Sequence, residues 1–171
     1  IVLNNTKKVF NPPPDLTISS WADSHRRLSP ENSAEAGQWN TTRAEYQREI
    51  MDTFNDPDIQ RIVVMTSSQV GKTELVLNAI AYYMDQDPSP MLVVQPTLAM
   101  AQSFSKDRLA AMIRDSKKIK DLVAESRSRD SGNTVLHKKF PGGHLSLVGS
   151  NSASGLSSRP IRILLLDEVD R

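Results

Sequence analysis

The sequence of 171 residues contains no cysteine, and aromatic residues make up 5% of it. A chain without cysteine forms no disulfide and no cysteine-ligated zinc site, which fits a reducing compartment. Long apolar runs are missing as well, because runs such as residues 163–166 are far too short to cross a bilayer. The first residues, IVLNNTKKVF, contain no apolar stretch of signal-peptide length. We therefore expect a soluble, intracellular protein without a membrane partner.

An excess of either charge is also missing. Lys and Arg number 21 and Asp and Glu number 20, so the net charge is +1 and gives no overall basic signal for nucleic acid. Any contact with DNA must then be a local patch. Hydrophobic residues make up 38% and charged residues 24%, without repeats or low-complexity tracts, which is typical of one globular domain at this length. The first residue is Ile1 rather than Met, from which we expect a piece of a longer protein.

Residues 1–40 differ in composition from the rest. They contain Pro12-Pro13-Pro14 and the polar stretch SPENSAEAG, with little periodicity, so we expect an extended arm or lead-in rather than core. Trp21 and Trp39 are expected to dock this arm. We expect the globular domain to span residues 41–171 and to begin with a helix that Thr41 or Thr42 caps and that Asn55-Asp56-Pro57 ends.

Three short apolar runs have the pattern of buried strands. They are RIVVMT at 61–66, MLVVQP at 91–96 and the apolar part of RILLLDEVDR at 163–166. Runs of this kind, without polar alternation, are typical of parallel strands that are covered on both faces. In such sheets ligands bind at the carboxyl ends of the strands.

Helical patterns lie between these runs. Apolar residues recur at helical spacing from Lys72 to about Met84, and Thr97 is placed to cap a further helix. Residues 133–140 and 144–150 alternate like a β-hairpin whose turn is longer than the tightest type. Strands alternating with helices predict an α/β fold, a three-layer sandwich around a mainly parallel sheet.

The stretch MTSSQVGKTE, residues 65–74, lies between the first strand and the first helix of this series. It ends like a phosphate-binding loop, G-x-x-x-x-G-K-[ST], but Thr66 stands where the first glycine belongs. Such loops bind phosphate through backbone N–H groups at a helix N-terminus, a lysine for the β- and γ-phosphates, and a hydroxyl on Mg²⁺. The residues predicted to hold the nucleotide here are Ser67, Ser68, Gln69, Val70, Gly71, Lys72, Thr73 and Glu74, with Thr73 also a magnesium ligand.

A second element, which is acidic, strengthens this interpretation. The strand at 163–166 ends in Asp167, which can hold the Mg²⁺ shell, and Glu168, which is placed to orient and deprotonate an attacking water. Each motif alone has an ordinary reading, a helix start for Lys72 and Thr73 and a solvated strand end for the acidic pair. Their combination predicts an ATP and Mg²⁺ site with Lys72 and Glu168 as catalytic residues.

Thr66 allows a conformational prediction. A β-branched residue at positive φ costs on the order of 1–3 kcal/mol, so Thr66 should stay strand-like and the tight turn should fall at Gly71. Lys72 is the loop's only charge between Thr66 and Thr73. Because an added arginine accelerates phosphoryl transfer, we consider Arg159 and Arg162 for a second cation; the alternative for both is a solvated strand end.

Beyond the loop, the sequence resembles the large terminase subunit of tailed bacteriophages, in the lambda-type branch, from about Gly37 to Arg171. The resemblance rests on an ordered series of segments, YQREIM, VVMTSSQVGKTE, DPSPMLVVQPT, FSKDRLAAMI and SNSASGLSSRPIRILLLDEVDR. Terminase loops commonly lack the first glycine, so Thr66 supports it. The resemblance implies a P-loop NTPase fold of the RecA/ASCE type and an ATP-driven motor that moves double-stranded DNA into a procapsid in the host cytoplasm. Implied partners are the small terminase subunit, the portal and further copies in a ring.

The resemblance also assigns roles to residues outside the loop. Tyr46 and Gln47 fall where such motors recognise adenine, although a helix with two polar faces is the alternative. Gln95-Pro96-Thr97 resembles a segment that helicase-like motors use near DNA, against the alternative of a strand end with a helix cap. Arg159 matches an arginine that reaches into the neighbouring subunit's site.

The sequence departs from the family in what lies beyond Arg171, where the coupling motif and the nuclease domain would follow. We therefore expect no DNA cleavage and weak or no ATP hydrolysis from this segment alone. Two other functions stay open, a RecA-like helicase lobe and a nucleotide-binding scaffold without turnover. A set of basic residues could track DNA or lie solvated among acidic neighbours: Lys117, Lys118, Lys120, Arg127, Arg129, Lys138 and Lys139.

Overall fold

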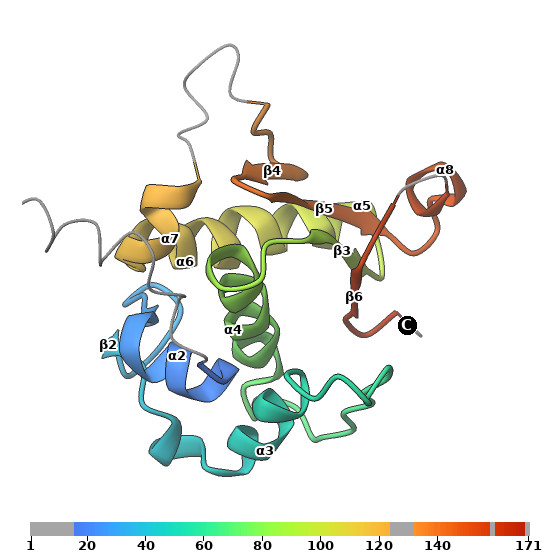
Figure 1. The fold of residues 1–171 in the computed structure, drawn as a ribbon. Helices are drawn as coiled ribbons and strands as arrows, with labels where there is room; N and C mark the ends of the chain where they lie inside the picture. Colours follow the sequence, from blue (N-terminus) through green and yellow to red (C-terminus); the bar gives the residue numbers. More distant parts are fainter. Residues whose placement is uncertain (1–15, 124–131, 158–159, 170–171) are drawn as a thin grey trace, which may run out of the picture.

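The computed structural model describes residues 16–123, 132–157 and 160–169 of the chain (Figure 1). Its helices are α2 (Ile18–His25), η1 (Thr41–Ala44, a 3₁₀ helix), α3 (Tyr46–Thr53), α4 (Lys72–Asp85), α5 (Leu98–Ser103), η2 (Phe104–Leu109, a π-helix), α6 (Ala110–Asp115), α7 (Lys117–Leu122) and α8 (Ala153–Leu156). Its strands are β1 (Arg27–Leu28), β2 (Gly37–Gln38), β3 (Pro90–Gln95), β4 (His137–Phe140), β5 (Gly143–Gly149) and β6 (Ile163–Leu166). In this part of the chain, no helix is both long and apolar enough to cross a membrane.

The central sheet has four strands in the order β4-β5-β3-β6. β3 runs parallel to both neighbours, with Val94 opposite Val148 on one side and Leu166 on the other. The carboxyl ends of these three strands therefore meet at one edge. The sequence predicts parallel strands for β3 and β6, whereas it assigns the residues of β5 only to a hairpin. β4 and β5 form the expected antiparallel hairpin, but its turn is tighter than expected, since Phe140 pairs directly with Gly143.

The main core lies between one face of this sheet and the helices. Met91 and Val93 of β3 belong to it, together with buried residues of α4 such as Leu77, Ile80 and Met84. Each of these large side chains contributes roughly 1.5–3 kcal/mol through burial. Figure 1 shows α4, α5, α6 and α7 on the same side of the sheet. One of the two expected helical layers is thus formed by these helices.

The opposite face of the sheet is covered by a smaller apolar cluster. Leu92, Val94 and Val148 form a small second cluster against Ile161 and Val169. Among the described helices, only the short α8 packs near this face, through Gly155 beside Val148. The expectation of helices on both faces is therefore not met by the described part of the chain.

The first predicted strand, at residues 61–66, is also wrong. The segment has no regular secondary structure, and Val63 and Met65 are 81% and 95% exposed. At the outer edge of the sheet, Leu164 and Leu166 of β6 are exposed as well. An apolar β-branched run becomes a strand only where a partner edge and two buried faces are available, which is a non-local condition.

Residues 16–40 are not an extended arm in the structure. Ile18, Trp21 and Ala22 are 0% exposed and belong to the main core, as does Trp39. Thr17 caps α2 by accepting a hydrogen bond from the Ser20 N–H. The two tryptophans do dock this segment, as predicted. The division of the chain at residue 40 stays a prediction, and residues 1–15 lie outside the described residues.

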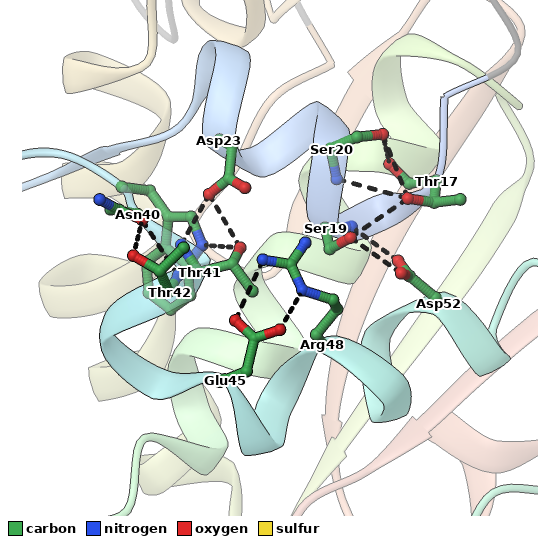
Figure 2. Close-up of polar contacts among 11 residues, drawn as sticks. Thr17, Ser19, Ser20, Asp23, Asn40, Thr41, Thr42, Glu45, Arg48 and Asp52 are labelled. Carbon is green, nitrogen blue, oxygen red and sulfur yellow. Dashed lines mark hydrogen bonds and ion pairs between the residues drawn. The ribbon is translucent and has the colours of Figure 1, made fainter.

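Polar contacts link the same N-terminal residues to the helices that follow them (Figure 2). The Asp23 carboxylate accepts hydrogen bonds from the Thr41 N–H at 2.6 Å and its hydroxyl at 2.8 Å. The Ser19 hydroxyl donates to Asp52 of α3 at 2.9 Å. These bonds join α2 to η1 and α3, and α3 leads towards the phosphate loop.

Candidate functional site

The predicted phosphate loop ends at the first turn of α4. Gly71 is the N-cap of the helix, in the left-handed region at φ 83°, and no side chain caps the helix there. The first N–H groups of a helix have no partner within it, so they point towards solvent or an anion. Thr66 is not among the residues at positive φ, which confirms that part of the prediction. Gln69, at φ 60°, is a second left-handed residue that the sequence did not indicate.

Lys72 and Glu168 meet at this helix start. The Lys72 Nζ lies 3.1 Å from the Glu168 Oε1, and both side chains are about 30% exposed (30% and 31%). The two residues are 96 positions apart, so the fold brings the two predicted motifs into contact. Glu168 has φ 50°, a conformation that costs a non-glycine residue of order 1–3 kcal/mol and that is found most often at functional sites.

Asp167 is fixed by the end of the neighbouring strand β3. Its N–H donates to the Val94 carbonyl at 3.0 Å, and its Oδ2 accepts a hydrogen bond from the Gln95 Nε2 at 2.9 Å. Gln95 is only 4% exposed. The segment is a strand end followed by a helix cap, because Thr97 accepts a hydrogen bond from the Met100 N–H at the start of α5. Its use near DNA stays a prediction. The contact of Gln95 with Asp167 was missed, since nothing local in the sequence signals a pair 72 residues apart.

Tyr46 and Gln47 lie against the loop. The Tyr46 hydroxyl and the Gln47 Nε2 both donate to the Val70 carbonyl, at 2.8 and 2.9 Å. Gln47 is 3% exposed, and a Cβ at Gly71 would lie 2.5 Å from its Nε2. The Gln47 Oε1 is buried and has no hydrogen-bond partner in the structure. The two residues thus sit at the predicted site, while their role towards adenine stays a prediction.

The other predicted loop residues differ in their exposure and in their contacts. Ser67 and Ser68 are exposed, and Thr73 is partly buried in the first turn of α4. The Glu74 carboxylate is bound to Arg26 of the N-terminal segment, with Arg26 Nη2 and Glu74 Oε2 2.7 Å apart. Sequence reasoning did not find Arg26, because the pair spans 48 positions.

The two candidate arginines do not both lie near this edge. Arg162 is at the opposite end of the sheet, where its N–H donates to the Pro90 carbonyl at the start of β3. Its guanidinium binds Asp87 at 2.7 Å, so in this structure Arg162 is a strand-end cation away from Lys72 and Glu168. Arg159 lies outside the described residues.

The oxygen ligands predicted for magnesium fit that ion. Mg²⁺ prefers hard oxygen ligands and is commonly held by one or two carboxylates together with substrate phosphates. Thr73 offers a hydroxyl and Asp167 a carboxylate whose Oδ2 is already oriented by Gln95. Across residues 16–123, 132–157 and 160–169, no three acidic or histidine side chains form an all-protein metal site.

The predicted basic patch is partly occupied by internal contacts. Lys118 pairs with Asp85 at 3.3 Å, and the Lys138 Nζ donates to the Thr134 carbonyl. Burial lowers the pKa of Lys138. Lys117, Lys120 and Lys139 remain exposed, whereas Arg127 and Arg129 lie outside the described residues.

Sequence comparison relates the chain to known proteins. The family model described as "Phage terminase large subunit gpA, ATPase domain" matches residues 33–171. The chain is 26% identical over 164 residues to the terminase large subunit of Escherichia phage lambda, covering 95% of this chain and 25% of that protein. It is 27% identical over 158 residues to the terminase large subunit of Enterobacteria phage P21, covering 92% and 24% respectively. The chain thus spans about a quarter of the length of these curated relatives. No solved structure matches it.

Proposed function

The chain belongs to the family of phage terminase large subunits, within the ATPase domain, and we propose that it is the ATP-hydrolysing part of a motor that packages double-stranded viral DNA. The observation that carries this proposal is the contact of Lys72 with Glu168 at a helix start capped by a glycine. It joins a phosphate-binding lysine to a carboxylate suited to activate water. A RecA-like fold is part of the same proposal.

Phosphate binding falls to the start of α4 and the loop before it. Gly71 leaves the first helical N–H groups uncapped, and the helix dipole favours negative charge there. Lys72, from the first turn, supplies the charge for the terminal phosphates. Tyr46 and Gln47 both donate to the Val70 carbonyl and so tie the loop to the start of α3.

Metal binding falls to Thr73 and Asp167. When bound, Mg²⁺ neutralises charge that develops on the phosphates during transfer. Gln95 holds one oxygen of Asp167 and leaves the other for the ion. The carboxylate is thereby oriented before any ligand arrives, which limits the entropy lost on binding.

Hydrolysis falls to Glu168. Its carboxylate can accept the proton of a water that attacks the terminal phosphate, and its contact with Lys72 keeps it within reach of that position. In the left-handed conformation the backbone of Glu168 turns away from the direction of β6, which points the carboxylate at the loop rather than along the strand.

Adenine recognition is proposed for Tyr46 and Gln47. The buried, unpaired Gln47 Oε1 is an acceptor suited to the exocyclic amine of adenine. Both residues also bind the Val70 carbonyl. Any movement of Tyr46 or Gln47 when adenine binds would therefore move the phosphate loop as well.

The wider setting of the motor is proposed from the family. The partners are double-stranded DNA, the small terminase subunit, the portal and procapsid, and further copies of the subunit in a ring, in the host cytoplasm. The full-length protein is proposed to carry an endonuclease as well. Arg159 is proposed to complete the neighbouring subunit's site, so Arg159→Ala should abolish turnover in the assembled motor and leave nucleotide affinity nearly unchanged.

The proposal is tested by ATP turnover in the purified full-length subunit with its packaging partners. Glu168→Gln should lower turnover by about 10²–10⁴-fold while ATP still binds, because the base is lost and the phosphate contacts remain. Glu49→Gln, on an exposed part of α3, is the matched control and should turn over normally. Equal turnover in wild type and Glu168→Gln would contradict the assignment. ATP binding without any turnover in wild type would favour a scaffold, and strand separation by the wild type would favour a helicase lobe.

A further inference from the structure

Glu74 places a negative charge at the end of α4 that the proposed function assigns to phosphate. It is the third residue of the helix, after Lys72 and Thr73, and so lies in the first turn. A carboxylate there interacts favourably with the helix dipole, but it competes with a bound anion for the same positive end. Left uncompensated, Glu74 would repel a triphosphate that carries several negative charges.

Arg26 compensates this charge from another part of the chain. It is the C-cap of α2, and its Nη2 lies 2.7 Å from the Glu74 Oε2. The side chains are 3% and 18% exposed, so water screens the pair poorly. The Arg26 Nη1 also donates to the Arg27 carbonyl, while its buried Nε has no hydrogen-bond partner in the structure. The guanidinium is thus held in one orientation, facing α4.

Stability alone does not account for this pair. A buried ion pair adds little to stability compared with an apolar pair of the same volume, because both charges must leave water. The packing of α2 on α4 is already provided by apolar residues such as Ile18 and Trp21, both 0% exposed. The distinctive consequence of the pair is therefore electrostatic.

We propose that Arg26 is a positioning residue of the nucleotide site, which cancels the charge of Glu74 and so makes triphosphate affinity depend on the N-terminal segment at residues 16–28. The inference rests on the proposed nucleotide binding and adds a residue and a segment to it. Displacement of this segment by any partner would expose the Glu74 carboxylate to the phosphates and weaken binding.

The test compares ATP and AMP affinities of the purified full-length protein, measured with fluorescent analogues in the presence of Mg²⁺. Arg26→Met should weaken ATP binding on the order of tenfold and AMP binding much less, because repulsion by Glu74 grows with ligand charge. The loss should shrink at high salt, which screens the repulsion. Arg26→Lys should retain part of the affinity, and Arg26→Met with Glu74→Gln should recover most of it.

A structural defect would give a different pattern. Thermal unfolding of each variant sets a measuring temperature at which all of them are folded, and Arg43→Met, which breaks the exposed Arg43–Glu35 pair, is the matched control with normal affinity. Equal losses for ATP and AMP, unaffected by salt or by Glu74→Gln, would overturn the inference, as would unchanged ATP affinity in Arg26→Met. Failure of the wild type to bind ATP at all would instead refute the proposed function, and the inference with it.

Discussion

Replacing Gln95 by leucine tests how the acidic strand is held. Leucine has a similar volume and fills the buried position, but it removes the 2.9 Å hydrogen bond from the Gln95 Nε2 to the Asp167 Oδ2. A hydrogen bond to a charged group contributes about 1.5–3 kcal/mol. Asp167 is only partly buried, so water can replace the lost donor to some extent and the lower end of that range applies. At about 1.5 kcal/mol, the melting temperature of a domain of this size should fall by roughly 3–6 °C.

Two assays separate the consequences of this change. Circular dichroism measures the melting temperature, and a Mg²⁺ titration of ATP binding measures how well Asp167 is oriented for the ion. Gln102→Leu, an exposed glutamine on α5, is the matched control and should change neither quantity. If Gln95→Leu melts within about 1 °C of wild type and needs no more Mg²⁺, then Gln95 does not hold Asp167 and this reasoning is refuted.

Two further changes test other parts of the structure. Gly71→Ala should cost about 1–3 kcal/mol and weaken ATP binding, since alanine would have to adopt φ 83° and its Cβ would lie 2.5 Å from the Gln47 Nε2; unchanged stability and affinity would rule out this loop conformation. Burial raises the pKa of Asp85, but hydrogen bonds from Trp21 and Gln86 and the charge of Lys118 outweigh it and lower the pKa overall. The ionised carboxylate therefore contributes stability above its unfolded pKa of about 3.9, and that stability is lost as the pH falls through the lower folded pKa. In thermal melts Asp85→Asn should be less stable than wild type at neutral pH and approach it in acid, and a gap that stays constant with pH would contradict this.

The features that the sequence predicts correctly have local causes. Apolar runs mark β3 and β6, and apolar residues at helical spacing mark α4. Gly71 was identified because a tight turn into a helix requires a residue that tolerates positive φ. Each of these inferences needs only a few neighbouring residues.

The failures depend on contacts between distant residues. Residues 61–66 have the composition of a strand, yet pairing requires a free sheet edge, and no described strand pairs with them. Gln95 and Arg26 bind partners far away in the sequence, so no local motif indicates them. The helix α2 was not predicted, because the residues around it are polar. Its signal was Thr17 as a cap, followed by Ile18, Trp21 and Ala22 on one face, at the spacing of a short amphipathic helix.

The central claim is that one site formed by the start of α4 and the end of β6 binds ATP and Mg²⁺. An experimental structure of the protein with Mg²⁺ and a non-hydrolysable ATP analogue tests it most directly. The account predicts the terminal phosphate beside the Lys72 Nζ, the ion bound by Thr73 and Asp167, and the Glu168 carboxylate facing the terminal phosphate. Phosphates bound away from the N-terminus of α4, or a metal ion without Asp167 among its contacts, would contradict it.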